Sequence, residues 1–376
     1  MMNESWKNTT IGEQATLQRG IDITRVAQRT GTVPVVSSGG ISSYHDTATA
    51  KGPGVVLGRK GVVGSVYYVA SDYWPHDTTL WVKDFHGNEP RFVYYFFKNF
   101  APRLATMDVG SANPTLNRNH VHPINVRWPP RVEQSAITAV LGTLDDKIQL
   151  NRQMNETLET IARALFLNRF VETTKTGLSK GWRYATIAEL CNINSWTLGN
   201  SDELDRIEYV EISEVVRGEI GNIPFYERGK EPTRARRRLR HGDTVLSTVR
   251  PERGSYFLCL HPSPGLIAST GFAVLTPTKA PWSFIHAAMT QSDIFGYLGQ
   301  QADGGAYPAV RPEIIGGLEV PWPGNPKVVE AFHQACAPLY ERAWHNREES
   351  RTLAALRDAL LPKLLSGQLR VPTQKE

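Results

Sequence analysis

The apolar residues between positions 130 and about 171 predict one long helix. They recur at alternating steps of four and three residues, the spacing of a helix that packs along its length against another helix. At about 1.5 Å per residue, about 40 residues would form a rod on the order of 60 Å long. The alternative is a long core helix of a single globular domain. The seam positions are Ile137, Leu141, Leu144, Ile148, Asn151, Asn155, Leu158, Ala162 and Leu165.

A second segment, 326–366, matches the first and supplies a partner for it. Asn151 aligns with Asn346 and Leu165 with Leu360, at a constant offset of 195 residues. Asn151 and Asn155 interrupt the apolar seam, and a polar seam residue helps to fix register and partner. Gly367 follows the segment and is a suitable left-handed helix cap.

The second half of the chain repeats the first. The offset between matching residues grows steadily, from 176 at the start of each copy to 195 at the long helices, as expected of a duplication with a few insertions. The main matches are Trp6 with Trp182, Val56-Leu57 with Val245-Leu246, Phe92 with Phe284, and Trp128-Pro129 with Trp322-Pro323.

Each copy reads as a mixed α/β globule followed by a long helix, so we predict an α+β fold with a pseudo-twofold internal repeat. If the helices pair antiparallel, the two globules lie at opposite ends of the rod and match a two-part site on duplex nucleic acid. The predicted domains are 1–130, 131–172, 173–325 and 326–368. Predicted strands are 55–57, 65–69, 78–82, 244–247, 255–260 and 272–275, and predicted short helices are 92–97 and 282–288.

Composition narrows the possible functions. The 376 residues suffice for two or three domains, and a formal net charge of +5 modestly favours a polyanionic partner. The three cysteines are widely separated, which is typical of a reducing cytoplasm and argues against disulfides or a zinc site. No apolar run approaches the ~20 residues of a membrane span, and the chain start does not resemble a signal peptide. We therefore expect a cytoplasmic protein.

Candidate nucleic-acid contacts form one basic cluster and several loops. Arginines between positions 228 and 240 could neutralise phosphates, although a solvated loop or helix face would look the same. Arginine recurs at one turn of both copies, where it could read guanine, and asparagine can pair with adenine. The first-copy candidates are Ser38, Tyr44, His45, Arg59, Lys60, Asn113, Asn117 and Arg118; the second-copy candidates are Arg234, Arg236, Arg237, Arg250, Arg253, Tyr307 and Arg311.

The sequence contains no convincing catalytic constellation. The stretch GRKGVVGS lacks the ending of a phosphate-binding P-loop. The ten histidines are dispersed without metal-ligand spacing. The tetrapeptide at 113–116 lacks the second proline and the aromatic residue of the adenine-methyltransferase tetrad. We predict a binding protein and scaffold that holds no cofactor or metal of its own.

The chain resembles the specificity (S) subunit of type I restriction–modification systems over essentially its whole length. The resemblance rests on the opening Trp6-x-x-x-Thr10-Ile11-Gly12-Glu13, the stretches at 52–69 and 76–82, the endings INVRWPP and LEVPWPG, and the helical segments at 145–159 and 357–369. Their duplicated order is the specific feature.

This resemblance implies two target recognition domains, each reading one half of a bipartite DNA sequence, with the helices as a ruler between them. It also implies two methyltransferase (M) subunits on the helices, which use S-adenosylmethionine to methylate a flipped adenine. Motor-nuclease (R) subunits would add ATP- and Mg²⁺-dependent restriction. Two other hypotheses remain open: an enzyme with an unrecognised nuclease or methylase centre, and a long-helix scaffold that binds protein or RNA.

Overall fold

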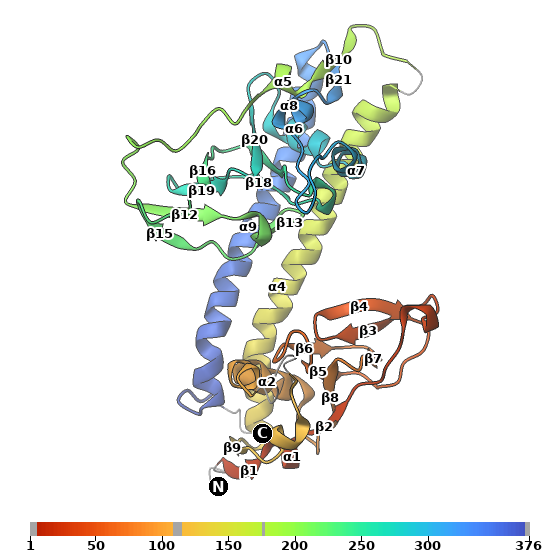
Figure 1. Ribbon diagram of the computed structural model, residues 1–376, viewed down its shortest axis with the longest axis vertical. Coiled ribbons are helices and arrows are strands. Elements are labelled where there is room, and N and C mark those ends of the chain that lie inside the picture. Colours follow the sequence, from red (N-terminus) through yellow and green to blue (C-terminus); the bar gives the residue numbers. More distant parts are fainter. Residues whose placement is uncertain (1–5, 108–114, 175–176, 373–376) are drawn as a thin grey trace. The chain divides into compact units, whose positions relative to one another are not determined.

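The structure, a computed structural model, describes residues 6–107, 115–174 and 177–372 (Figure 1). The chain forms two compact units. Unit 1 comprises residues 1–149 and 351–376, and unit 2 comprises residues 150–350. Each of the two long helices therefore contributes one part to each unit. The mixture of sheets and helices confirms the predicted α+β fold.

Unit 1 contains nine strands in its described residues, arranged in three sheets. The strands are β1 (Lys7–Thr10), β2 (Thr16–Arg19), β3 (Val33–Ser37), β4 (Gly40–His45), β5 (Gly54–Gly58), β6 (Val66–Val69), β7 (Trp74–Pro75), β8 (Thr79–Asp84) and β9 (Asn125–Trp128). The helices are α1 (Ile11–Gln14), η1 (Arg25–Ala27), α2 (Pro90–Ala105), α3 (Arg118–Val121), the start of α4 (Arg131–Phe166) and the end of α9 (Pro326–Leu365).

Unit 2 has the same order of elements with additions. Its strands are β10 (Trp182–Thr186), β11 (Cys191–Ile193), β12 (Arg206–Val210), β13 (Val215–Val216), β14 (Glu219–Ile220), β15 (Phe225–Glu227), β16 (Ala235–Arg238), β17 (Asp243–Ser247), β18 (Tyr256–Cys259), β19 (Leu266–Ser269), β20 (Phe272–Pro277) and β21 (Glu319–Pro323). Its other helices are η2 (Leu167–Val171), η3 (Glu172–Thr174), α5 (Ile187–Leu190), η4 (Ile212–Glu214), η5 (Pro251–Arg253), α6 (Trp282–Met289), α7 (Ser292–Gln300) and α8 (Pro312–Gly316).

The main sheets of the two units have the same topology. In the described residues, unit 1 has the order β2-β8-β5-β6 and unit 2 has the order β11-β20-β17-β18. The first strand of each sheet follows a one-turn helix that a capping box starts, with Thr10 and Glu13 in unit 1 and Thr186 and Glu189 in unit 2. The duplication seen in the sequence is therefore present in the fold.

The central strand of each main sheet is buried on both faces. Val56 and Val245 face one core, whereas the next residues, Leu57 and Leu246, face the core that includes the helices. Successive side chains of a strand point to opposite faces, so matched residues enter matched cores. The predicted strands at 55–57 and 244–247 correspond to β5 and β17.

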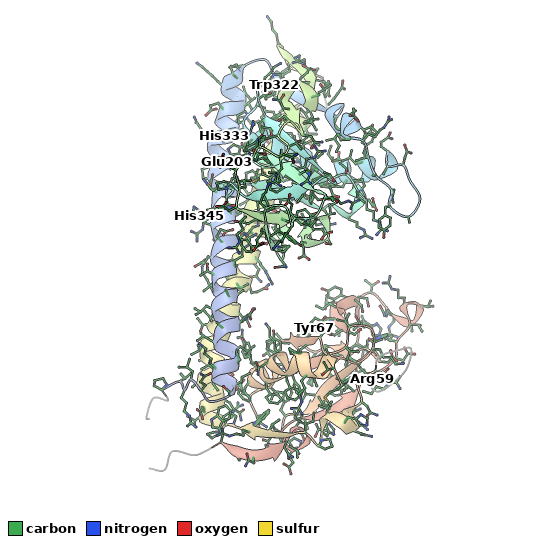
Figure 2. The ribbon with its side chains drawn as sticks, turned by 60° about the vertical axis from the view of Figure 1, so that its left-hand side comes forward. Arg59, Tyr67, Glu203, Trp322, His333 and His345 are labelled. Carbon is green, nitrogen blue, oxygen red and sulfur yellow. The ribbon has the colours of Figure 1, made fainter. Side chains whose placement is uncertain are left out.

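An aromatic contact is also repeated. Trp128 packs edge-on against Phe92 at 5.3 Å between ring centroids, and Trp322 packs edge-on against Phe284 at 5.4 Å. Figure 2 labels Trp322 in unit 2. All four residues are matched positions of the sequence repeat. Their contacts show that each copy closes its core with the same Phe–Trp pair.

The second sheets differ between the units. Unit 1 has the order β4-β3-β7, and unit 2 has β15-β12-β19-β16 in its described residues. The strand β16 pairs with β19 over residues 235–238, whereas unit 1 has a single bridge, Ala50 with Tyr73, in the corresponding place. The basic cluster at 228–240 therefore contains an added strand, where the sequence pattern indicated only a loop or a helix face.

The long helices pair antiparallel within each unit. In unit 1, Asp145 of α4 binds Arg357 of α9 at 2.6 Å. In unit 2, the Asn151 side-chain amide donates to the Asn346 carbonyl at 3.2 Å and to the Ser350 hydroxyl at 3.2 Å. Asn346 in turn donates to Asn155 at 2.9 Å. The aligned positions 151 and 346 thus contact each other, as expected for a local pseudo-twofold.

The predicted seam is correct except at its end. Ile137, Asn151 and Ala162 are buried, but Leu165 is 41% exposed and the next residue, Phe166, is buried instead. An ideal α-helix drifts by about 20° per heptad relative to a 3.5-residue repeat, so after several heptads the inward position moves by one residue. The aligned position in α9 shows the same shift, because Leu361 is buried and Leu360 is only half-buried.

Part of the excess apolar surface of the helices packs on the chain's own domains. Phe166 and Phe170 belong to the core of unit 2, and Leu361 and Leu364 belong to the core of unit 1. These four side chains are therefore buried within the chain itself and are not available for docking of a partner subunit. A smaller set stays exposed on the helices, namely Val132, Leu150, Ile161, Leu165 and Leu356.

Candidate nucleic-acid interface

A cavity of about 530 Å³ in unit 1 brings together three arginines from separate parts of the chain. Arg19 ends β2, Arg59 follows β5, and Arg118 begins α3. The cavity floor is apolar, and its rim carries further hydrogen-bonding groups. The lining residues are Gln18, Arg19, Arg59, Leu80, Thr115, Leu116, Asn117 and Arg118. Figure 2 labels Arg59 on unit 1.

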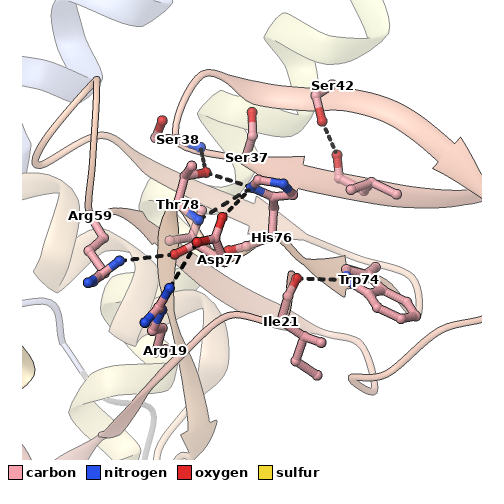
Figure 3. A network of polar contacts seen from close by, with 12 residues as sticks. Arg19, Ile21, Ser37, Ser38, Ser42, Arg59, Trp74, His76, Asp77 and Thr78 are labelled. Carbon is pink, nitrogen blue, oxygen red and sulfur yellow. Dashed lines mark hydrogen bonds and ion pairs between the residues drawn. The ribbon is translucent and has the colours of Figure 1, made fainter. Parts of the chain in front are cut away.

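Asp77 orients two of these arginines (Figure 3). Its carboxylate forms an ion pair with Arg19 at 2.9 Å, and its backbone carbonyl accepts a hydrogen bond from Arg59 at 3.2 Å. His76 lies 3.2 Å from the same carboxylate and bonds the Thr78 hydroxyl at 3.0 Å. The network fixes the directions of the guanidinium groups without using all their donors, because each arginine has five N–H groups.

The cavity has an excess of positive charge. Burial is the largest cause that lowers the pKa of Arg59 below its usual value, and the neighbouring Arg19 lowers it further, while Asp77 acts in the opposite direction. Arginine stays protonated, so the guanidinium groups keep their charge in a partly desolvated place. An oxygen-rich partner such as phosphate or the guanine O6/N7 edge would relieve this repulsion through bidentate hydrogen bonds.

Unit 2 has a cavity of about 790 Å³ beside the equivalent elements, strand β11 and short helix α8, but it is displaced toward α5, which also lines it. Its chemistry differs from that of the first cavity. Its lining includes one arginine, Arg237 from β16, together with Glu313, Asn192 and Asn194. Burial lowers the pKa of Arg237, and its Nε atom finds no partner among the described residues. The buried thiol of Cys191 has a pKa raised to about 12 by burial, so it is not a reactive thiolate.

Backbone hydrogen bonds define which residues correspond at the loop of each copy. Leu116 donates to the Arg59 carbonyl at 2.9 Å, and Val310 donates to the Thr248 carbonyl at 2.8 Å. The residue equivalent to Arg59 is therefore Thr248. Arg250 and Arg253 lie further along the same loop. Both copies therefore have arginine in this turn, but not at equivalent positions.

The second-copy loop presents Arg250 beside an exposed ring. The Arg250 backbone is left-handed, with φ of +47°, and its guanidinium donates to the Ala306 carbonyl at 2.6 Å. Its Cζ lies 4.7 Å from the centroid of the Tyr307 ring, which is 73% exposed. Arg253 and Arg311 are also exposed, and Arg311 precedes the first residue of α8. This group could stack on a base and contact phosphates.

Two arginines of the strand β16 form ion pairs within the unit, whereas the arginine that precedes the strand is exposed. Arg236 pairs with Glu231 at 3.2 Å, and Arg238 pairs with Asp202 at 2.5 Å while lying 3.9 Å from the Trp196 ring centroid. Arg234 is exposed. The segment around Thr197 runs along the outer side of β16, since Leu198 donates to the Arg236 carbonyl at 2.7 Å. Much of the basic cluster therefore stabilises the second sheet.

Three further candidates of the first copy, Ser38, Tyr44 and His45, do not line the arginine cavity. Ser38 is buried in the turn of the β3–β4 hairpin, and Tyr44 is 55% exposed on β4. The segment 37–45 is thus a turn and a strand, where the sequence suggested a loop. His45 is 4% exposed, with its Nδ1 accepting from the Arg29 amide at 3.0 Å and its ring against Trp74, so it is a core residue.

Two asparagines were also predicted as base contacts. Asn117 lines the cavity, but its side chain accepts from the Asn119 amide at 3.0 Å as the N-cap of α3. Asn113 lies outside the described residues. Lys60 is exposed, and its backbone bridges Thr115 at the edge of the cavity.

Sequence reasoning missed Arg19, Gln18 and Asp77. Arg19 stands alone in sequence, 40 residues before Arg59, and only the pairing of β2 with β8 brings it to the cavity. A basic residue at the end of a strand carries no distinct signal by itself.

Comparison with known proteins shows which family has this arrangement. A family model described as the type I restriction modification DNA specificity domain matches residues 3–160. The MjaIX specificity subunit of a type I restriction enzyme, from Methanocaldococcus jannaschii, is 23% identical over 325 residues, covering 76% of this chain and 70% of the relative. The chain therefore carries a type I restriction modification DNA specificity domain over residues 3–160, and over most of its length it is similar to specificity subunits of type I restriction enzymes.

Two further specificity subunits are similar to the chain over most of their length. The HindI specificity subunit from Haemophilus influenzae is 23% identical over 331 residues, covering 68% of this chain and 71% of the relative. The crystal structure of the type I restriction–modification S subunit from M. genitalium superposes with a TM-score of 0.63 at 16% identity, covering 97% of each chain. Among the described residues of this chain, no helix is long and apolar enough to span a membrane.

Proposed function

We propose that the chain reads a bipartite DNA sequence, with one half-site read by each unit, while partner subunits carry out the chemistry. The observation that supports this proposal most directly is the pair of corresponding cavities. Both are lined by equivalent elements, β2 with α3 in unit 1 and β11 with α8 in unit 2, but the first cavity carries three arginines and the second carries one arginine with asparagine and glutamate side chains. Two units with the same main sheet but different cavity side chains are suited to the recognition of two different base sequences.

In unit 1, we assign the contact with DNA to Arg19, Arg59 and Arg118. Asp77 holds two of these guanidinium groups in place before DNA binds, so little side-chain entropy is lost on binding. Arg118 and Lys60 at the rim would contact phosphates, which position the domain on the duplex but carry no sequence information. Arg59, the partly buried member, is our candidate for reading guanine.

In unit 2, we assign the contact to a broader surface. Arg237 lines the cavity, and Arg250 with Tyr307 presents a cation and an aromatic face on the neighbouring loop. Exposed Arg234, Arg253 and Arg311 would neutralise phosphates. Because Asn192 and Glu313 line the cavity, adenine and cytosine edges suit this surface better than they suit the arginine cavity of unit 1.

We assign catalysis to partner subunits. In this proposal, two methyltransferase subunits dock on the long helices and supply S-adenosylmethionine chemistry, and motor-nuclease subunits supply ATP- and Mg²⁺-dependent restriction. The apolar residues that stay exposed on the helices support docking. Ile161 and Leu165 lie one turn apart on α4, at 44% and 41% exposure, and Leu356 on α9 is 47% exposed.

Selection from a random DNA pool tests the proposal. The full chain, purified with its methyltransferase partner, should enrich two conserved blocks separated by unselected positions. The double variant Arg19→Ala/Arg59→Ala should lose conservation in one block and keep the other. A single block, loss of both blocks, or binding without sequence preference at any salt concentration would contradict the assignment and favour a general scaffold.

The spacing between the blocks provides a second test. Both long helices run continuously through residues of the two units. Removal of one heptad from each helix should therefore change the preferred spacing, which we expect to be about one DNA turn, on the order of 10 base pairs. An unchanged spacing in a folded variant would show that the helices do not set it. Methylation or cleavage of DNA by the chain alone would favour the enzyme hypothesis.

A further inference from the structure

We propose that His241, His261 and Glu341 form a binding site for a divalent transition-metal ion, which we take to be Zn²⁺. The three ligand atoms lie within 4.8 Å of one another. The sequence shows no sign of such a site, because the residues are spread over about 100 positions and follow no metal-binding motif. The ion would link two loops of unit 2 to the long helix α9.

Strand pairing explains why the two histidines meet. Asp243 at the start of β17 pairs with Cys259 at the end of β18, so the residues just beyond these ends, 241 and 261, leave the sheet side by side. The Gly242 amide donates to the Cys259 carbonyl at 2.7 Å, and the His261 amide donates to His241 Nδ1 at 3.3 Å. The imidazole rings lie 4.7 Å apart between centroids.

Glu341 completes the group from α9. One of its carboxylate oxygens lies 2.9 Å from His261 Nε2. Within the described residues this is its ion pair, and no lysine or arginine is bound to the carboxylate. The carboxylate can therefore accept a cation without first losing a lysine or arginine partner.

Aromatic neighbours hold the two rings in place. His241 packs edge-on against Trp282 at 5.9 Å, and His261 lies 4.8 Å from Trp344. The His261 backbone is left-handed, with φ of +47°, a conformation that non-glycine residues rarely adopt outside functional sites and turns. A Cβ at Gly242 would lie 2.8 Å from the Trp282 Cβ, and the Gly242 φ is +86°, so glycine is needed beside His241.

The donor set determines which ion fits. Two imidazole nitrogens and one carboxylate oxygen form a common zinc set, with the fourth position open to water. Bonds of about 2.0–2.1 Å require the ligand atoms to lie closer together than 4.8 Å, and the exposed side chains of His241 and His261 can turn to achieve this. Mg²⁺ and Ca²⁺ prefer oxygen ligands and should bind much more weakly.

Unit 1 is an internal control that lacks the site. The pairing of β5 with β6 makes Gly52 and Ser71 the residues equivalent to His241 and His261. The position equivalent to Glu341 is Asp146, which is bound by Arg91 at 2.6 Å. A different group, Asp22, His76 and Asp77, could also be considered, but Asp77 is already bound to Arg19 at 2.9 Å. We therefore place the metal only in unit 2.

Metal titration of the full chain tests this proposal. After chelator treatment and dialysis, ZnCl₂ in a calorimeter should show one saturable site, and it should raise the melting temperature because ligands that bind the folded state stabilise it. Co²⁺ should give the strong visible absorption of a four-coordinate site. MgCl₂ at the same concentration should leave the melting temperature unchanged.

Three variants locate the ion. His261→Asn keeps a residue that tolerates the left-handed backbone, and Glu341→Gln keeps the size of the side chain. Each should weaken Zn²⁺ binding by at least about 10–100-fold, since loss even of an outer-shell partner of a metal ligand has this effect. His345→Ala removes an exposed histidine of the same helix (Figure 2) and should bind like the unchanged chain.

Two outcomes would overturn the proposal. One is the absence of saturable Zn²⁺ binding in the unchanged chain. The other is equal binding by the unchanged chain and by His261→Asn, provided that both melt at the same temperature in chelator. These measurements do not involve DNA, so their result is independent of the proposed function.

Discussion

The two cavities lie beside equivalent elements, β2 with α3 in unit 1 and β11 with α8 in unit 2, yet they differ in almost every side chain that lines them. Unit 1 places arginines on a strand end, a loop and a helix start, with Asp77 between two of them. Unit 2 has Thr248 where unit 1 has Arg59, and it takes its one lining arginine, Arg237, from the added strand β16. Recognition chemistry therefore varies at the strand ends, while the strands themselves are maintained.

The cores show the opposite behaviour. Val56 and Val245, Leu57 and Leu246, and the Phe–Trp pairs repeat with the same partners and the same orientation. Burial on both faces leaves few alternatives for the central strand, because a change of one methylene in a packed core affects stability. The lining of an exposed cavity has no such constraint. This difference allows predictions that separate shared from specific features.

The largest effect should follow from removing both oriented arginines of unit 1. Each well-placed bidentate contact contributes about 1–3 kcal/mol, so Arg19→Ala/Arg59→Ala should lower affinity for the cognate DNA by at least about 100-fold at fixed salt. Fluorescence anisotropy of labelled duplex measures the loss. Arg103→Ala, which removes an exposed arginine of α2, should change affinity little. An equal loss with both variants would show that only general charge matters.

Protonation of His286 should be a source of acid destabilisation in unit 2, where Asp243, whose pKa burial raises to about 6, acts in the opposite direction. Burial lowers the pKa of His286 to about 3, whereas the unfolded chain titrates at about 6.5. Between these two pH values, the His286 imidazole therefore stays neutral in the folded chain but takes up a proton in the unfolded chain. The contribution of His286 to the free energy of unfolding is therefore fully present above about pH 6.5. Below that pH it falls by about 1.4 kcal/mol per pH unit, so about 2 kcal/mol is lost at pH 5. The aligned residue in unit 1 is Tyr94, so unit 1 has no histidine at this position.

Urea unfolding at pH 7 and pH 5, followed by limited proteolysis of each unit, measures this difference. His286→Gln should remove the destabilisation of unit 2 that protonation of His286 causes between pH 7 and pH 5, even if the variant is less stable at pH 7. An unchanged difference in stability between pH 7 and pH 5 in the variant would exclude His286 as a contributor.

The capping boxes should contribute equally in both units. Thr10→Ala and Thr186→Ala each remove the side-chain cap of a one-turn helix that precedes the first strand of a main sheet. Each should lower the free energy of unfolding of its own unit by about 1 kcal/mol. Denaturant unfolding of the two variants checks this. A large effect in one unit alone would show that the shared scaffold is not energetically equivalent.

The smallest predicted effect concerns the exposed ring of unit 2. Tyr307→Ala removes the cation–π contact with Arg250 and a stacking surface for a base. A contribution of about 0.5–1 kcal/mol corresponds to a loss of about two- to fivefold in DNA affinity. Tyr297→Ala, which removes an exposed tyrosine of α7, is the matched control. A loss with the control equal to that with Tyr307→Ala would remove Tyr307 from the interface.

Much of the scaffold could be predicted from sequence because it rests on local and repeated patterns. The seam at Ile137 and Asn151, the strands at 55–57 and 244–247, and the two Phe–Trp pairs follow from periodicity and duplication. The predicted seam is wrong only at Leu165, where small rotations per turn have accumulated. The second sheets were missed, since short polar strands such as β4 and β16 have no clear alternation.

The sites were harder to predict because they depend on pairing between distant strands. Arg59 was recognisable as a basic residue between glycine-flanked strands, but Arg19 reaches it only through the β2–β8 ladder. His45 was a reasonable surface candidate by residue type, yet it is buried against Trp74. The three metal ligands proposed for unit 2 meet through a strand pair and a helix, a combination that no linear spacing reveals.

The segment that runs along the outer side of β16 has a consequence for solubility. An added strand at the margin of a sheet leaves a row of unpaired amides and carbonyls, which can recruit strands from other molecules. Residues 196–198 occupy that row through bonds to Arg236 and Arg238. Shortening or loosening this segment should promote aggregation of the chain well before it alters any contact with DNA.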